Sequence, residues 1–105
     1  MVINGIEWTI KYVKANSPVL QRKDGTYTLG VTDGIDNVVY IAYSLSDYMF
    51  TRVLTHELVH CVCFSYGILL DIDTEELIAD FMANYGFEVI SLVEDFLTKC
   101  KIMVE

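Results

Sequence analysis

The chain has 105 residues, of which 53% are hydrophobic, and a formal net charge of −8. This length suits a single domain with one hydrophobic core, and the composition is that of a folded globular protein rather than a disordered or fibrous one. The negative charge disfavours nucleic acid and anionic membrane surfaces as partners, because both repel an acidic protein. The apolar stretches are short and interrupted by charges, so we expect no membrane span and no signal peptide, and hence a cytoplasmic protein.

Three strands are predicted in the first part of the chain. Apolar and polar residues alternate near residues 5–13, the period-two pattern of a half-buried strand. Residues 27–32 form a second expected strand, after which Asp33 and Gly34 reverse the chain. Residues 37–43, NVVYIAY, are rich in β-branched and aromatic side chains and predict the third strand.

The pattern changes to helix from Ser44 onward. Ser44 and Ser46 are equally good caps for a first helix, which is expected to run to Gly67. Apolar residues occur around nearly all of this helix, so it is predicted to be central and buried.

Two further helices are predicted in the last third of the chain. The first begins at Asp73 or Thr74 and continues to about Tyr85, where Gly86 ends or kinks it. The next covers residues 87–101. It has an apolar stripe that we interpret as core: Val89, Ile90, Val93, Phe96 and Leu97. The expected fold is α+β, with a small three-stranded sheet packed on three helices.

The three cysteines are Cys61, Cys63 and Cys100, and they are expected to be reduced because an odd number cannot pair within one chain. On a helix, Cys61 and Cys63 point about 200° apart, so both cannot bind one ion. We interpret them as buried structural thiols.

The sequence THELVH, residues 55–60, contains the only two histidines of the chain. On a helix His56 and His60 lie on one face, so their imidazoles can bind one cation at about 2.0 to 2.1 Å, which suits zinc. Glu57 then lies beside the metal and can take a proton from a zinc-bound water. This is the His-Glu-x-x-His arrangement of zinc metallopeptidases. The alternative interpretation is a pair of hydrogen-bonded core histidines.

A catalytic zinc site usually has three protein ligands, and no further histidine is available. The next helix offers Glu75 and Glu76. We predict Glu76, because Asp80 lies one turn further along the same face and could accept a hydrogen bond from a ligand histidine. Glu75 has no such partner, since the residue four positions on is Ala79.

These segments resemble the small gluzincin-type metallopeptidases, in particular the ImmA/IrrE-type peptidases of phages and mobile elements and the single-domain minigluzincins. The likeness covers a strand, VVYIAY, the helix with THELVH, and the segment EELIADFMANYG. It implies His56, His60 and Glu76 as zinc ligands and Glu57 as general base. It also implies that Asp80 orients a ligand histidine.

The resemblance further implies that an extended peptide substrate pairs with the strand before the first helix, here residues 38–43, by strand addition. No other histidine can stabilise the oxyanion, so either a tyrosine does so, with Tyr43, Tyr66 and Tyr85 as unranked candidates, or that function is missing. The leading hypothesis is therefore a zinc-dependent endopeptidase hydrolase. The alternative is a non-catalytic protein-binding module that keeps a zincin scaffold, with or without metal. The sequence leaves the substrate open.

Overall fold

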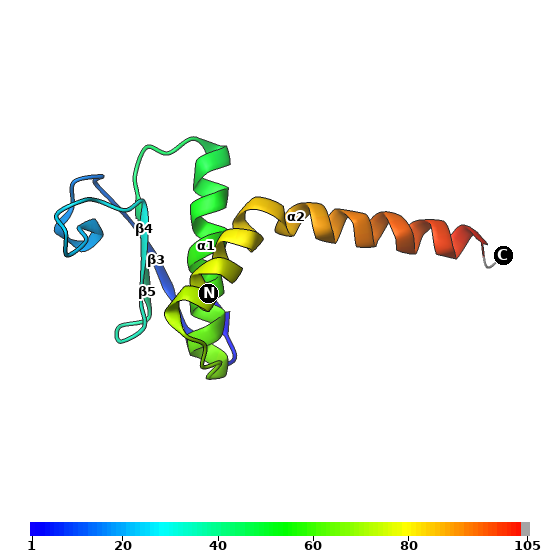
Figure 1. Cartoon of the computed structure of the whole chain (residues 1–105), viewed down its shortest axis with the longest axis horizontal. Coiled ribbons are helices and arrows are strands. Elements are labelled where there is room, and N and C mark those ends of the chain that lie inside the picture. The colour runs from blue at the N-terminus through cyan, green and yellow to red at the C-terminus, as the bar shows by residue number, and fades with distance from the viewer. Residues whose placement is uncertain (104–105) are drawn as a thin grey trace.

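The structure is a computed structural model that describes residues 1–103, with side chains described for residues 1–99. The coarse fold class is α+β, as expected. Five short strands, one short 3-10 helix and two long α-helices follow one another along the chain (Figure 1). They are β1 (Val2–Ile3), β2 (Ile6–Glu7), β3 (Thr9–Val13), the short 3-10 helix η1 (Pro18–Leu20), β4 (Gly30–Asp33), β5 (Val38–Ala42), α1 (Asp47–Tyr66) and α2 (Ile72–Met103).

The main sheet has the strand order β3-β5-β4. β5 lies in the centre, parallel to β3 and antiparallel to β4. Four of its five residues are buried, which agrees with its almost wholly apolar sequence, VVYIA. The three predicted strands are therefore present, although the first is divided into β2 and β3 and the second begins only at Gly30.

α1 lies between the sheet on one side and α2 on the other (Figure 1). Its N-terminal cap is Ser46, whose hydroxyl accepts a hydrogen bond from the Met49 N–H at 3.2 Å. Its C-terminal cap is Gly67, as predicted, in the left-handed conformation with φ of 63°. These caps set the two ends of α1.

The hydrophobic core lies between the sheet and α1. Its fully buried members are Trp8, Val39, Ile41 and Cys61. The indole N–H of Trp8 donates a hydrogen bond of 2.8 Å to the Ser65 hydroxyl, so the polar atom of this buried ring has a partner. The central position predicted for α1 is thus confirmed, but its expected burial all round is not, because Val62 and Phe64 are 40% and 55% exposed.

The two helices predicted after residue 72 are one continuous helix, α2. Gly86 does not end it, although α2 changes direction between its yellow and orange parts (Figure 1), so of the two predicted outcomes, an end or a kink, only the end is excluded. A glycine inside a helix costs only about 1 kcal/mol relative to alanine. Gly86 also keeps an ordinary negative backbone φ, unlike Gly67 at the end of α1. The prediction of a third helix was therefore wrong, because glycine is a far weaker helix breaker than proline.

The second half of α2 extends away from the rest of the molecule (Figure 1), and all residues from 87 to 99 are exposed. We call residues 87–99 the arm. The stripe predicted to be core lies on it and is exposed instead, Val89 by 43% and Phe96 by 65%. That prediction was wrong because no element in the described part of the chain covers this face. Within residues 1–103, no helix is long and apolar enough to cross a membrane.

Candidate metal centre

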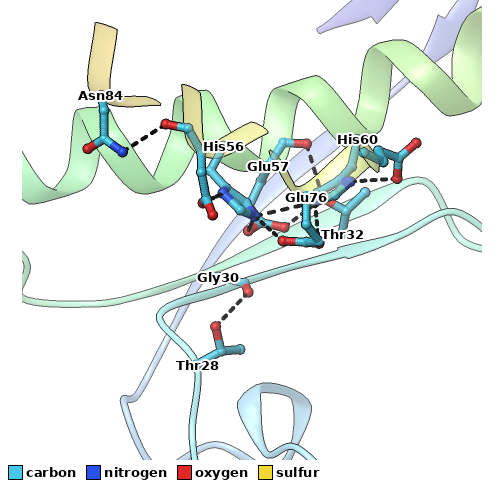
Figure 2. A network of polar contacts seen from close by, with 10 residues as sticks. Thr28, Gly30, Thr32, His56, Glu57, His60, Glu76 and Asn84 are labelled. Carbon is cyan, nitrogen blue, oxygen red and sulfur yellow. Dashed lines mark hydrogen bonds and ion pairs between the residues drawn. The ribbon is translucent and has the colours of Figure 1, made fainter. Parts of the chain in front are cut away.

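Three potential metal ligands meet where α2 crosses α1 (Figure 2). His56 and His60 project from successive turns of α1, and Glu76 reaches them from the first turns of α2. The two Nε2 atoms of the histidines are 3.3 Å apart. One carboxylate oxygen of Glu76 lies 3.1 Å from His56 Nε2 and the other lies 3.0 Å from His60 Nε2.

This spacing fits a tetrahedral metal ion. Ligand atoms that bind one ion at about 2.1 Å in tetrahedral geometry are separated by about 3.4 Å. The three observed separations, from 3.0 to 3.3 Å, are close to that value. His56, His60 and Glu76, the three ligands predicted from the sequence, could therefore hold a metal ion with little rearrangement.

Both histidines are oriented by carboxylates of α2. His56 Nδ1 lies 2.8 Å from Asp80 Oδ1, and His60 Nδ1 lies 2.7 Å from Glu75 Oε2. When each Nδ1–H donates to its carboxylate, each Nε2 keeps a free lone pair directed at the site. The contact expected between Asp80 and one of the two histidines is therefore present, with His56.

The role of Glu75 was missed by the sequence analysis. Glu75 was set aside because its own helix offers no partner one turn away, but its partner lies on α1. Adjacent residues on a helix point about 100° apart, so Glu75 and Glu76 can reach different sides of the same histidine. The sequence feature that could have indicated this contact is the position of Glu75 directly before Glu76, the predicted ligand.

Glu57 is buried beside this cluster, with 6% of its surface exposed. Its Oε2 lies 3.9 Å from His56 Nε2, and its Oε1 accepts a hydrogen bond of 2.9 Å from the Thr32 hydroxyl on β4. Burial raises the pKa of Glu57 above its ordinary value, while Thr32 and the two histidines partly oppose this shift. The geometry gives Glu57 a fixed carboxylate beside the site but outside the ligand set. Thr32 was not singled out by the sequence pattern.

A cleft of about 870 Å³ opens beside the cluster, lined by β4, α1 and α2. Its walls include His56, Glu57, His60 and Glu76. Tyr43, Tyr66 and Tyr85, the tyrosines predicted as oxyanion donors, are not among the described residues that line it. The side chains that offer hydrogen-bond donors to the cleft away from the ligand cluster include Tyr27, Arg52 and Asn84.

The strand predicted to bind substrate, residues 38–43, contains β5 and cannot accept a further strand. β3 and β4 pair with its two edges along Val38–Ala42. Whether a strand is central or at an edge depends on pairings between distant segments, which local sequence does not specify. In the described sheet, β4 has an unpaired edge, and Gly30 and Thr32 of β4 line the cleft (Figure 2).

Cys61 and Cys63 are buried free thiols, as predicted, and neither belongs to the ligand cluster. Burial raises the pKa of the Cys61 thiol to about 11, so it stays protonated. The prediction for Cys100 concerns a side chain outside the described residues.

No family profile matches this sequence, and no match to a curated protein or to a solved structure was found.

Proposed function

We propose that the protein is a zinc-dependent endopeptidase of the gluzincin type. The observation that carries this proposal is the set of three ligand atoms 3.0 to 3.3 Å apart, beside a buried glutamate and an open cleft. Two imidazoles and one carboxylate form a ligand set used by catalytic zinc, which keeps its fourth position for water or substrate. The alternative interpretation, two hydrogen-bonded core histidines, would explain neither the open cleft beside them nor the third potential ligand, Glu76.

Zinc held by His56, His60 and Glu76 would polarise the scissile carbonyl and acidify the attacking water. Glu57 lies outside this ligand set, so its carboxylate is available as the general base. It takes the proton of the attacking water and passes it to the leaving nitrogen. The Thr32 hydroxyl holds Glu57 in place through one oxygen and leaves the other directed toward the histidines.

We further propose that the substrate binds as an extended peptide along β4, in place of the strand expected from the sequence. A strand edge offers backbone donors and acceptors to any sequence, which suits a peptidase. β4 is short and lines the same cleft as Glu57. Its first residue, Gly30, brings the strand close to that glutamate, since an ideal Cβ at Gly30 would lie 3.0 Å from Glu57 Cγ and 2.7 Å from Val53 Cγ1.

The second candidate is a protein-binding module that keeps this scaffold without catalysis. The observation that favours it is the position of the three tyrosines expected to stabilise an oxyanion, since none lines the cleft. A peptidase of this design would have to use another donor, such as Arg52.

Glu57→Gln separates the two functions. Glutamine has nearly the same shape but cannot accept the proton, so the variant should keep its zinc and lose the general-base contribution, about 10²- to 10⁴-fold in rate. The measurements are zinc content by elemental analysis and cleavage of an unstructured protein with and without chelator. Glu88→Gln is the matched control, because it makes the same change on the exposed arm.

The outcomes distinguish the candidates. Zinc bound by both variants, with cleavage lost only in Glu57→Gln, supports the peptidase. Stoichiometric zinc without cleavage by the unaltered protein favours the binding module. Equal cleavage by the unaltered protein and Glu57→Gln would exclude the proposed mechanism.

A further inference from the structure

α2 carries a regular line of exposed apolar side chains along one side. We call this line the seam. Its members recur at alternating intervals of four and three residues, which is the spacing of the core positions of a coiled coil. They are Ile78, Met82, Tyr85, Val89, Leu92 and Phe96. All six are between 37% and 65% exposed, although the spacing is that of buried positions.

The opposite side of the arm is mostly polar. At 100° per residue, Ser91, Glu94, Asp95 and Thr98 gather on the side away from the seam, together with one apolar residue, Phe87, which is 65% exposed. The arm is therefore amphipathic, as expected for a helix that packs against something. Within the described residues nothing packs on its apolar side.

The charges of the arm restrict the partner. Its charged residues are Glu88, Glu94, Asp95 and Lys99, so the arm is acidic overall, like the whole chain with its net charge of −8. An anionic membrane or a nucleic acid would be repelled. An amphipathic helix that binds membranes usually carries several lysines and arginines on its polar side. The one lysine of the arm, Lys99, lies beside the seam, and the charged residues of the polar side are Glu94 and Asp95. The partner is therefore an apolar protein surface.

We propose that this surface is the seam of a second copy of the chain, and that two α2 helices pair antiparallel about a two-fold axis near residue 87. The reason is the symmetry of the seam. Antiparallel pairing about residue 87 places Ile78 opposite Phe96 of the other copy. The same register pairs Met82 with Leu92 and Tyr85 with Val89, so every seam residue meets a seam residue.

The length of the seam supports a stable contact. Residues 78 to 96 span about 27 Å at 1.5 Å per residue, and two copies together contribute twelve apolar side chains from six positions. In Figure 1 the sheet-bearing body lies at one end of α2, so antiparallel pairing would place the two bodies at opposite ends of the helix pair. Each acidic arm would then lie beside the acidic first half of the other α2, so the contact would depend on the apolar seam and not on charge. Parallel pairing would bring both bodies, which carry the acidic centres, to the same end.

Most of the seam is separate from the candidate metal centre. Glu76 and Asp80 lie roughly 160° to 200° around the helix from Ile78, whereas Glu75, which contacts His60, lies about 60° from it. The positions varied in the first test below lie on the arm, which contributes no residue to the candidate centre.

The first test is the mass of the full chain in solution, measured by light scattering after size exclusion and by sedimentation over a range of concentrations. One chain is 12.0 kDa, so a dimer is 2 × 12.0 = 24.0 kDa. We expect a dimer for the unaltered protein and a monomer for Leu92→Glu. Ser91→Glu is the matched control, since it adds the same charge to the polar side of the same turn, and it should stay dimeric.

A monomer at every concentration, a larger assembly, or a dimer unchanged by Leu92→Glu would overturn the proposal. Phe96→Glu provides a second disruption. Both residues lie on the exposed arm, so circular dichroism should show that the variants remain folded.

The second test is the register. In a Cys100→Ser background, Tyr85→Cys and Val89→Cys proteins with different tags are oxidised separately and as a mixture. Antiparallel pairing predicts a disulfide between the two variants in the mixture and almost none in either alone. Cross-linking of each variant only with itself would indicate parallel pairing and would overturn the proposed arrangement.

Discussion

At the scale of single residues, the candidate metal centre contains three carboxylates within six positions of α2. Glu76 reaches both histidines, while Glu75 and Asp80 each accept a hydrogen bond from one imidazole. These outer contacts fix the histidine tautomers and make the ligand nitrogens more basic. One short helical segment therefore supplies both a ligand and the groups that orient the other ligands.

Substitutions at these positions should separate ligands from orienting groups. We expect Glu76→Ala to abolish tight zinc binding, because only two protein ligands remain. Glu75→Ala and Asp80→Ala should each weaken zinc binding by about 10- to 100-fold, since each loses one orienting contact. Competition with a chelator of known affinity measures these changes.

Asp73→Ala is the control for the loss of one negative charge, because Asp73 is exposed on the same helix. If Glu75→Ala binds zinc as tightly as Asp73→Ala, then the contact between Glu75 and His60 does not contribute to the site.

At the scale of elements, the sequence was most informative where the signal was local. α1 was predictable because its cap, its terminal glycine and its buried faces all lie within one stretch of chain. The two histidines could be paired for the same reason, since four residues on a helix are one turn. Glu76 was predictable because a short connection makes α1 and α2 neighbours.

Properties that depend on distant segments were not predictable in the same way. The central place of β5 results from pairing with β3 and β4. The contact between Glu75 and His60 joins two helices, and the Thr32 contact to Glu57 joins a strand to a helix. The apolar stripe of the arm was identified correctly as apolar, but its burial within the chain was wrong because burial requires a covering surface.

Alanine should change the stability of the protein in opposite directions at two glycines, Gly30 in β4 and Gly86 in α2. At Gly30, an added Cβ would lie 2.7 Å from Val53 Cγ1 and 3.0 Å from Glu57 Cγ, so β4 and α1 would have to separate. We expect Gly30→Ala to destabilise the fold by about 1 to 3 kcal/mol, the usual cost of overpacking. It should also lower activity by moving Glu57.

Gly86→Ala is the matched change in α2. The nearest atom to its added Cβ is the flexible end of Met82, at 3.0 Å. Alanine is favoured over glycine in a helix by about 1 kcal/mol, so this variant should be equally or more stable. Urea denaturation measures the free energy of unfolding of both variants. A Gly30→Ala protein as stable as the unaltered one would mean that β4 and α1 are not tightly packed at the cleft.

At the scale of the whole molecule, α2 is held to the rest of the protein largely by polar groups. Among its described side chains, Ala79 is the one hydrophobic residue that is buried, whereas the sheet and α1 share a core that includes Trp8, Val39 and Ile41. The contacts between the two helices therefore centre on the histidines and carboxylates of the site. Four carboxylates, Glu57, Glu75, Glu76 and Asp80, converge there, and without a cation their mutual repulsion opposes the docking of α2.

Metal removal should consequently loosen α2 before it affects the sheet. A ligand at 1,000 times its dissociation constant stabilises the folded state by about 4 kcal/mol, so chelation should lower the melting temperature by several degrees or more. Hydrogen exchange should show faster exchange in residues 72–86 of the chelated protein, while β5 remains protected, because its backbone bonds and core contacts do not involve the site. Glu76→Ala supplies the control, since it lacks a metal ligand and should melt at the same temperature with and without chelator. If the unaltered protein also melts at the same temperature in both conditions, then no tightly bound metal ties α2 to α1, and the carboxylate and histidine cluster must be stable by its own ion pairs alone.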